Sequence, residues 1–265
     1  MEALVDWLTQ QNVIAVGLVA SLIAGAATGL GALPLLLTRR VSQRLMDGLL
    51  GGAAGVMLAA TSFSLIVPAL DAGGGGVMAA LIVVGGIMLG ALFLERADRW
   101  LPHEHFVKGA EGPSSSLRRT WLFIIAITLH NFPEGLAVGV GFGQGGRENI
   151  ANGLSLAIGI GLQNIPEGLA VAVALLREKY ALPRAMWIAL LTGLVEPVGG
   201  LVGVGLVNVA MVLLPWGLAF AAGAMLFVIS DEIIPETHRK GFARVATFGV
   251  MIGFCVMMFL DNTLG

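Results

Sequence analysis

Two similar strings hold the polar residues best suited to chemistry. His130–Gly139 reads HNFPEGLAVG and Gln163–Ala172 reads QNIPEGLAVA. In both strings the glutamate follows the first residue by four positions, so these two side chains share one face of a helix. The asparagine is offset by one position and can serve a second, adjacent site. Imidazole and carboxylate groups together are typical ligands of zinc and other divalent transition metals.

A third carboxylate, Glu196, is predicted at the same depth as these strings. At a rise of ~1.5 Å per residue, His130, Gln163 and Glu196 each lie roughly 15–20 Å along their segments, near the middle of a ~30 Å hydrocarbon core. An ionisable group at that depth costs about 2.5–3.5 kcal/mol on insertion scales and is by default a functional candidate. The cluster contains no lysine or arginine, which favours a bound cation.

The predicted metal ligands come from four apolar segments. Met57 could add a thioether, although apolar packing is the commoner role of a methionine in such a place. For the repeated strings the alternative is a polar contact between helices, which two copies together with Glu196 argue against. The full set is Met57, His130, Asn131, Glu134, Gln163, Asn164, Glu167 and Glu196.

Further polar residues flank this set and could form an entrance and an exit for the ion. The competing interpretation is that charged residues at helix ends are simply solvated. The candidates are Ser64 and Asp71 toward one side, and Asp98, His103, His105, Asp231, Glu232, Glu236 and His238 toward the other.

The composition indicates that these polar residues are held by membrane-spanning segments. Of the 265 residues, 57% are hydrophobic and only 12% are charged, and the mean hydropathy is +0.88. Soluble domains carry about 25% charged residues, so a soluble protein, a disordered chain and a nucleic-acid binder are excluded. The single cysteine, Cys255, rules out a disulfide framework. No GxxxxGK[ST] motif occurs, so ATP is not an expected partner, and Gly139–Gly146 is interpreted as a helix end.

The fold class predicted is an all-α polytopic membrane protein with eight transmembrane helices in a single domain, residues 1–265. Each apolar run has 18 residues or more, enough to cross a bilayer. A β-barrel is disfavoured because its strands alternate apolar and polar residues. The first run is too long, and its flank too acidic, for a cleaved signal peptide. The runs are 13–37, 48–70, 77–94, 120–142, 150–176, 185–214, 216–237 and 245–264, with a flexible loop at 99–119.

Basic residues indicate the orientation. Fourteen of the 15 lysines and arginines fall in the four alternate loops that follow the first, third, fifth and seventh runs, and only Arg147 falls on the other side. The positive-inside rule therefore places these loops in the cytoplasm and both termini outside the cell.

Weaker similarities link the two ends of the chain. Ala53–Leu58 (AAGVML) resembles Ala221–Leu226 (AAGAML), and Thr28–Leu30 repeats as Thr192–Leu194. The paired segments run in opposite directions, which is the arrangement of an inverted repeat and is common in secondary transporters. Proline follows three residues after His130 and Gln163 and is expected to perturb both helices.

On the two repeated strings, together with SDEIIPETH in the seventh run, the chain resembles the ZIP (Zrt/Irt-like) family of divalent metal transporters, most closely its bacterial branch. The resemblance implies a 3+2+3 inverted-repeat bundle, a homodimer and a bacterial inner-membrane location. It also implies two metal positions bridged by Glu134 and Glu167, the first with Met57, His130 and Gln163 and the second with Asn131, Asn164 and Glu196. His103, His105, Asp231 and Glu232 would then be inner release positions.

The function expected is uptake of zinc, with cadmium, iron or manganese as other divalent cargo, by elevator-like alternating access and without enzymatic chemistry. A selective metal channel is the main alternative, since sequence does not separate a channel from a carrier. An intramembrane metallohydrolase would need an open zinc position and a general base, and no HExxH motif occurs. A metal sensor is disfavoured by the lack of a sizeable soluble domain.

Overall fold

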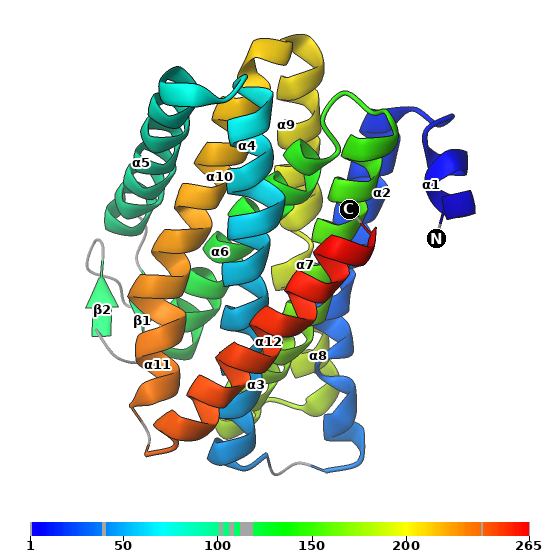
Figure 1. Ribbon diagram of the computed structural model, residues 1–265. Coiled ribbons are helices and arrows are strands. Elements are labelled where there is room, and N and C mark those ends of the chain that lie inside the picture. Colours follow the sequence, from blue (N-terminus) through cyan, green and yellow to red (C-terminus); the bar gives the residue numbers. More distant parts are fainter. Residues whose placement is uncertain are drawn as a thin grey trace.

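The computed structural model describes residues 2–38, 41–100, 103–105, 109–111, 119–239 and 241–264. Long helices pack side by side in a bundle (Figure 1). Within the described residues, seven helical segments are long and apolar enough to cross a membrane, and α6 (Arg119–Gly141) takes the place of the fourth expected span. The prediction of a polytopic helical membrane protein is confirmed.

The remaining elements follow the expected runs in order. They are α1 (Glu2–Leu8), α2 (Val13–Leu30), η1 (Leu33–Leu36), α3 (Gln43–Ala59), η2 (Ala60–Ile66), α4 (Val67–Ala72), α5 (Gly76–Trp100), β1 (His103–His105), β2 (Gly109–Glu111), α7 (Arg147–Arg177), α8 (Leu182–Gly193), α9 (Glu196–Val209), η3 (Met211–Leu213), α10 (Leu214–Val228), η4 (Ile229–Ile233), α11 (Ile234–His238) and α12 (Ala243–Leu264).

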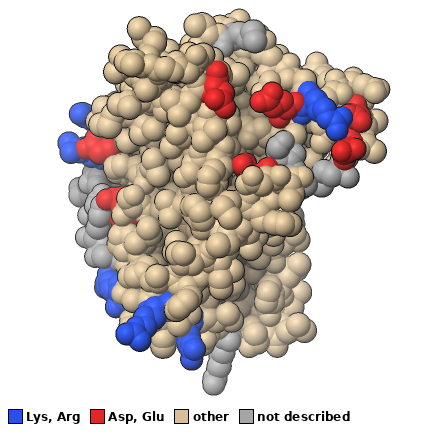
Figure 2. Space-filling model, in the orientation of Figure 1, with Lys and Arg blue, Asp and Glu red and all other residues tan. Residues whose placement is uncertain are grey.

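The connections gather at two ends of the bundle. The turn at residues 178–181 and the start of α12 lie at one end, here named the basic end. α1 and the start of α7 lie toward the opposite end, here named the terminal end (Figure 1). Lysine and arginine side chains show mainly along the lower and left parts of Figure 2, while acidic groups and a single basic cluster show at the upper right. Arg147, the first residue of α7, forms an ion pair with Asp6 of α1.

Several expected boundaries are wrong by a few residues. The second span begins at Gln43 rather than 48, because the Ser42 side chain accepts a hydrogen bond from the Leu45 amide and caps the helix. The third continues to Trp100 rather than 94, with an Arg99–Glu95 ion pair of 2.5 Å supporting its last turn. The loop expected to be flexible contains a short antiparallel hairpin, in which β1 pairs with β2.

The sixth expected span, 185–214, is not one continuous helix. It ends as α8 at Gly193 and resumes as α9 at Glu196. Pro197 lacks the amide that would bond the carbonyl one turn earlier, and its ring disfavours a helical residue before it. The α-helix of the first span ends at Leu30, within one residue of the equivalent position, which supports the inverted repeat. By contrast, α6 and α7 continue through their internal prolines.

Two π-helical segments, which the sequence pattern did not predict, occupy equivalent places in the repeat. η2 follows the string Ala53–Leu58 and η4 follows Ala221–Leu226. Proline lies four residues after Ser64 in the first case and four after Asp231 in the second. Proline supplies no amide to the carbonyl one turn earlier, so the helix widens there.

Glycines let specific helices touch backbone to backbone. A Cβ atom on Gly135 of α6 would overlap the Glu196 carbonyl, and one on Gly168 of α7 would overlap the Thr28 carbonyl of α2. Elsewhere, a Cβ on Gly55 of α3 would overlap the backbone of α12, and one on Gly90 of α5 that of α10. Small residues that permit such approach are typical of packed membrane helices.

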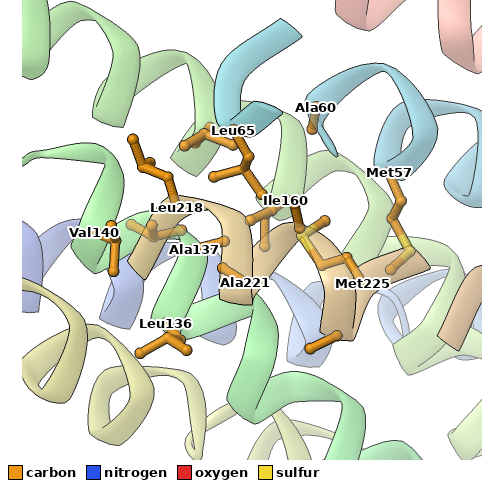
Figure 3. Close-up of a cluster of buried hydrophobic side chains, with 14 of the residues drawn as sticks. Met57, Ala60, Leu65, Leu136, Ala137, Val140, Ile160, Leu218, Ala221 and Met225 are labelled. Atoms are coloured by element: carbon orange, nitrogen blue, oxygen red, sulfur yellow. The ribbon is translucent and has the colours of Figure 1, made fainter. Parts of the chain in front are cut away.

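These contacts divide the bundle into two groups of helices. The motif group comprises α2, α6, α7, α8 and α9, and the frame group comprises α3–η2–α4, α5, α10–η4–α11 and α12. The main apolar cluster lies where the groups meet (Figure 3). This cluster contains Met57, Ala60 and Leu65 of the frame group together with Ile160 and Val140 of the motif group.

Candidate metal site

The repeated strings place their polar residues inside the motif group. His130, Asn131 and Glu134 lie on α6, and their partners Gln163, Asn164 and Glu167 lie on α7. Each of these six side chains is at most 4% exposed. Since α6 and α7 pack together and Glu134 interacts electrostatically with Glu167, the two copies of the motif lie close to each other.

Glu196 reaches the same region because of the break between α8 and α9. It is the first residue of α9 and is fully buried. A helix start carries partial positive charge and unsatisfied amides, so a carboxylate is favoured there. The glycine contact between Gly135 and the Glu196 backbone brings α9 directly against the motif on α6.

A chain of hydrogen bonds joins three of the predicted ligands. The Gln163 Nε2 amide donates to Asn164 Oδ1 over 3.0 Å, and Asn164 Nδ2 donates to Glu196 Oε1 over 2.6 Å. Asn164 Nδ2 also lies 2.8 Å from the carbonyl oxygen of Ala24 on α2. The asparagine therefore fixes Glu196 and links three helices of the motif group.

The glutamates interact with one another across the helices. Glu134 interacts electrostatically with Glu167 and Glu196. Glu167 also interacts electrostatically with His130 and Glu232. The sequence contains no lysine or arginine within residues 121–146, 148–176 and 185–238. Buried carboxylates that repel each other without a basic neighbour are costly unless a cation joins them.

His130 faces the frame group. Its Nε2 atom lies 2.6 Å from Oε1 of Glu232 in η4, and both side chains are at least nine-tenths buried. The sequence placed Glu232 on a release path rather than in contact with the repeated motif. The π-helical segment presents this carboxylate to α6, and the ion pair joins the two groups of helices.

Several polar atoms at this site have no hydrogen-bond partner in the described part of the chain. They include both amide atoms of Asn131, both carboxylate oxygens of Glu134 and one oxygen each of Gln163, Glu167 and Glu196. Buried groups of this kind normally find a partner. The unpartnered oxygens thus mark a place built to bind something further.

The side chains do not form a closed shell of charged ligands. Across the described residues, no three His, Cys, Asp or Glu side chains are grouped so that they could hold a metal ion. His130 is turned toward Glu232, and Glu196 is held by Asn164. Met57 is 1% exposed and lies in the apolar cluster between the groups (Figure 3). Metal ligation by the predicted set would need some of these side chains to rotate.

The predicted pathway residues fall in several places. Asp231, Glu232 and Glu236 are partly buried along η4 and α11. The His238 ring bonds Thr247 of α12 over 3.0 Å, which ties two helices together. Asp71 is exposed at the end of α4. Asp98 belongs to α5 and both loop histidines, His103 and His105, to β1, but their side chains lie outside the described residues.

Near the terminal end the structure adds a residue that sequence reasoning missed. Ser64 Oγ donates to Asp261 Oδ1 of α12 over 2.5 Å. Asn152 Nδ2 of α7 donates to the Ser64 carbonyl over 3.1 Å, the carbonyl that Pro68 leaves without its α-helical donor. Asp261 could have been singled out as the one acidic residue of the last apolar run.

Comparison with known proteins is consistent with this geometry. Residues 101–261 match the family described as ZIP Zinc transporter. The chain is 52% identical over 254 residues to the Zinc transporter GufA of Myxococcus xanthus, covering 94% of this chain and 99% of the relative. It is 46% identical to the Zinc transporter ZIPB of Bordetella bronchiseptica, over 99% of this chain and 86% of that one. It is 36% identical to the Zinc transporter ZIP11 of Homo sapiens, over 84% and 90% respectively.

Proposed function

Because this chain belongs to the ZIP zinc transporter family, we propose that it carries zinc across a membrane through the buried polar site between α6, α7 and α9. The observation that carries the proposal is the group Glu134, Glu167 and Glu196, three buried carboxylates in stretches of the chain that contain no lysine or arginine (121–146, 148–176 and 185–238). A divalent cation offsets their mutual repulsion, whereas an anionic or apolar cargo does not.

Two metal positions fit the available donors. The first takes Met57, His130 and Gln163, and the second takes Asn131, Asn164 and Glu196, with Glu134 and Glu167 bridging. The unpartnered oxygens of Glu134 and Glu167 support the bridging role, since each needs a partner. The second position holds two amides and one unshared carboxylate, so we expect it to bind metal more weakly than the first. Cadmium is a further candidate cargo, because its softness suits the thioether and imidazole.

The His130–Glu232 ion pair supports a route toward the basic end. A histidine that bonds a carboxylate in one arrangement and ligates metal in another exchanges one electrostatic partner for the other. In our proposal the metal leaves its central ligands for Glu232 and then for Asp231. In this structure His130 lies beside Glu232, the first carboxylate on that route.

The distribution of glycine contacts supports an elevator-like movement of one group against the other. Within the described residues, every glycine whose Cβ would overlap a backbone carbonyl oxygen meets a helix of its own group, as Gly135 meets α9 and Gly55 meets α12. Across the boundary the contacts are of side chains, as where Gly159 of α7 meets Met257 of α12. Backbone-to-backbone packing makes each group rigid, while the boundary between the groups is free to slide.

The boundary itself is suited to sliding. Its residues are small or unbranched at many positions, among them Ala137, Ala221 and Met225 (Figure 3). Methionine adapts its shape easily, and alanine leaves no deep interlocking ridge. A metal site carried on the motif group would therefore change its access from one side of the membrane to the other without unfolding.

Direction and setting follow from the charge distribution. The loops rich in arginine belong in the cytoplasm by the positive-inside rule, so uptake ends at the basic end, where Asp231 and Glu232 lie. We propose a bacterial inner-membrane location with both termini outside, and a homodimer as the assembled form.

Uptake into proteoliposomes tests the proposal. Labelled zinc is presented outside vesicles that contain the wild-type chain, Glu134→Gln, Glu167→Gln or the control Glu148→Gln, an exposed residue at the start of α7. We expect saturable uptake in the wild type and the control and at least a tenfold loss in the other two. Undiminished uptake in Glu134→Gln and Glu167→Gln would refute the site, and flux that does not saturate would identify a channel.

A further inference from the structure

Two buried hydroxyls near the terminal end have no role in the site described so far. Thr61 in η2 and Ser155 in α7 are both fully buried. Their oxygen atoms lack a hydrogen-bond partner among the residues that the structure describes. Burying a hydroxyl without a hydrogen-bond partner lowers the free energy of unfolding. These two hydroxyls are therefore expected to have a function that offsets this cost.

Neighbouring hydroxyls show that the absence of a bond is not a general feature of these helices. Ser62, the next residue in η2, donates to the Leu58 carbonyl over 2.8 Å. Ser21 and Thr128 also donate to the carbonyl one turn back. This local bond is the usual way in which a helical hydroxyl is satisfied in an apolar environment. Thr61 and Ser155 do not use it.

The register of the two helices places these hydroxyls at one level. η2 and α7 run antiparallel, and Asn152 bonds the Ser64 carbonyl. On α7 the residue three positions toward the basic end from Asn152 is Ser155, on the same helix face. On η2 the residue three positions toward the basic end from Ser64 is Thr61. One turn further, a Cβ on Gly159 would lie 3.5 Å from the Val56 side chain. The hydroxyl pair therefore lies between two observed contacts of the same helix pair.

The same boundary leads to the central site. On α7 the residues Asn152, Ser155, Gly159, Gln163 and Glu167 recur at intervals of three or four and form a single stripe. On the facing segment Thr61 and Ser64 follow Met57 in the sequence, and so lie between it and the terminal end. The polar track thus ends at two of the proposed metal ligands, Gln163 and Met57. It crosses the boundary at which the two groups of helices would slide.

We propose that Thr61 and Ser155 form a separate, transient position for a partly hydrated divalent cation on its way to the central site. Hydroxyl oxygens replace some of the water that the ion must shed, and Ser64, Asn152 and Asp261 cover the position in this arrangement. The Ser64–Asp261 hydrogen bond joins η2 to α12, within the frame group, while Asn152 reaches Ser64 from the motif group. Movement between the groups would break the latter bond and open the track. This inference rests on the proposed transport function.

Removal of the hydroxyls separates a role in transport from a role in folding. Thr61→Val and Ser155→Ala, alone and combined, keep most of the side-chain volume and remove an unpartnered polar group, so the melting temperature in detergent should stay the same or rise. Ser62→Ala is the matched control, because its hydroxyl is satisfied within the helix. Zinc uptake into proteoliposomes, zinc affinity at equilibrium and the melting temperature are measured on each protein.

We expect the double variant to raise the KM for zinc uptake about tenfold, as for loss of a hydrogen bond to a charged group. Its equilibrium affinity should stay within about twofold of wild type, and Ser62→Ala should behave as wild type. An unchanged KM overturns the inference. So does a lower melting temperature, which marks a structural role, or a lost equilibrium affinity, which places the hydroxyls in the central site. Glu134→Gln in the same assay reports separately on the proposed function.

Discussion

His130 Nε2 of α6 and Glu232 Oε1 of η4 lie 2.6 Å apart in the interior of the bundle. Each belongs to a different group of helices, so this ion pair is both a contact of the predicted metal motif and a link across the boundary between the groups. Whatever binds the motif through His130 must compete with Glu232. The His130 side chain therefore couples metal binding at the motif to the contact between the two groups of helices.

Weakening this ion pair should change binding and turnover in opposite directions. In Glu232→Gln, His130 has a neutral partner and is more available to metal. We expect tighter zinc binding at equilibrium, by about tenfold, and a lower kcat, because the release path has lost its carboxylate. Titration calorimetry in detergent and uptake kinetics measure the two effects. Equal losses of affinity and kcat would show instead that Glu232 is a ligand of the bound state.

A covalent bond across the boundary should stop transport. The Cβ atom of Val140 in α6 lies 4.0 Å from the position of a Cβ on Gly217 in α10, which is within the range of a disulfide. We expect Val140→Cys with Gly217→Cys, in a Cys255→Ser background, to lose uptake on oxidation and to recover it on reduction.

The matched control crosslinks two helices of the same group. A Cβ on Gly17 of α2 would lie 3.3 Å from the Cβ atom of Val204 in α9, so Gly17→Cys with Val204→Cys joins helices that are expected to move together. Oxidation should leave its uptake intact. If the oxidised Val140–Gly217 pair transported normally, a sliding movement at this boundary would be ruled out.

Glycine at the α6–α9 contact should be essential to stability. In Gly135→Ala the new methyl group overlaps the Glu196 carbonyl, and helices that pack backbone to backbone must separate. We expect a loss of about 2–3 kcal/mol, the cost of overpacking a well-packed site, seen as a lower melting temperature in detergent. Gly205→Ala on α9 is the control, since its Cβ would have no atom within 4 Å. A Gly135→Ala protein as stable as this control would mean that α9 shifts easily.

The second metal position should respond to added charge. Asn164 donates to both Glu196 and the Ala24 carbonyl, and Asn164→Asp removes these donations and places two carboxylates together. The metal-free protein should be destabilised by about 1–3 kcal/mol, and excess zinc should restore more stability than it does in wild type.

Melting curves with chelator and with zinc check the Asn164→Asp prediction, and the zinc stoichiometry from equilibrium dialysis shows whether the second position fills. Asn208→Asp serves as the control, because Asn208 on α9 is partly buried and donates to the Val204 and Gly143 carbonyls rather than to a carboxylate. A zinc-induced stabilisation no greater in Asn164→Asp than in Asn208→Asp would place Asn164 outside any metal position.

Much of the architecture follows from local sequence. A bilayer leaves no backbone group unsatisfied, so long apolar runs must be helices, and residues four apart on a helix share a face. These two rules, with the rise per residue, were enough to place each repeated motif on one helix face and to predict Glu196 at the same depth. The family membership and the helical membrane fold are confirmed by the structure and the comparisons, while the assignment of individual metal ligands stays a prediction.

The tertiary structure decided the features that depend on which helices are neighbours and in what register. Nothing local in the sequence pairs Ser64 with Asp261 or His130 with Glu232, because these partners are far apart along the chain and meet only through packing. The break before Glu196 and the two π-helical segments involve prolines that the sequence shows, yet α6 and α7 continue through theirs. Hydropathy fixes where a chain crosses the membrane, but the contacts between helices determine which buried polar groups meet.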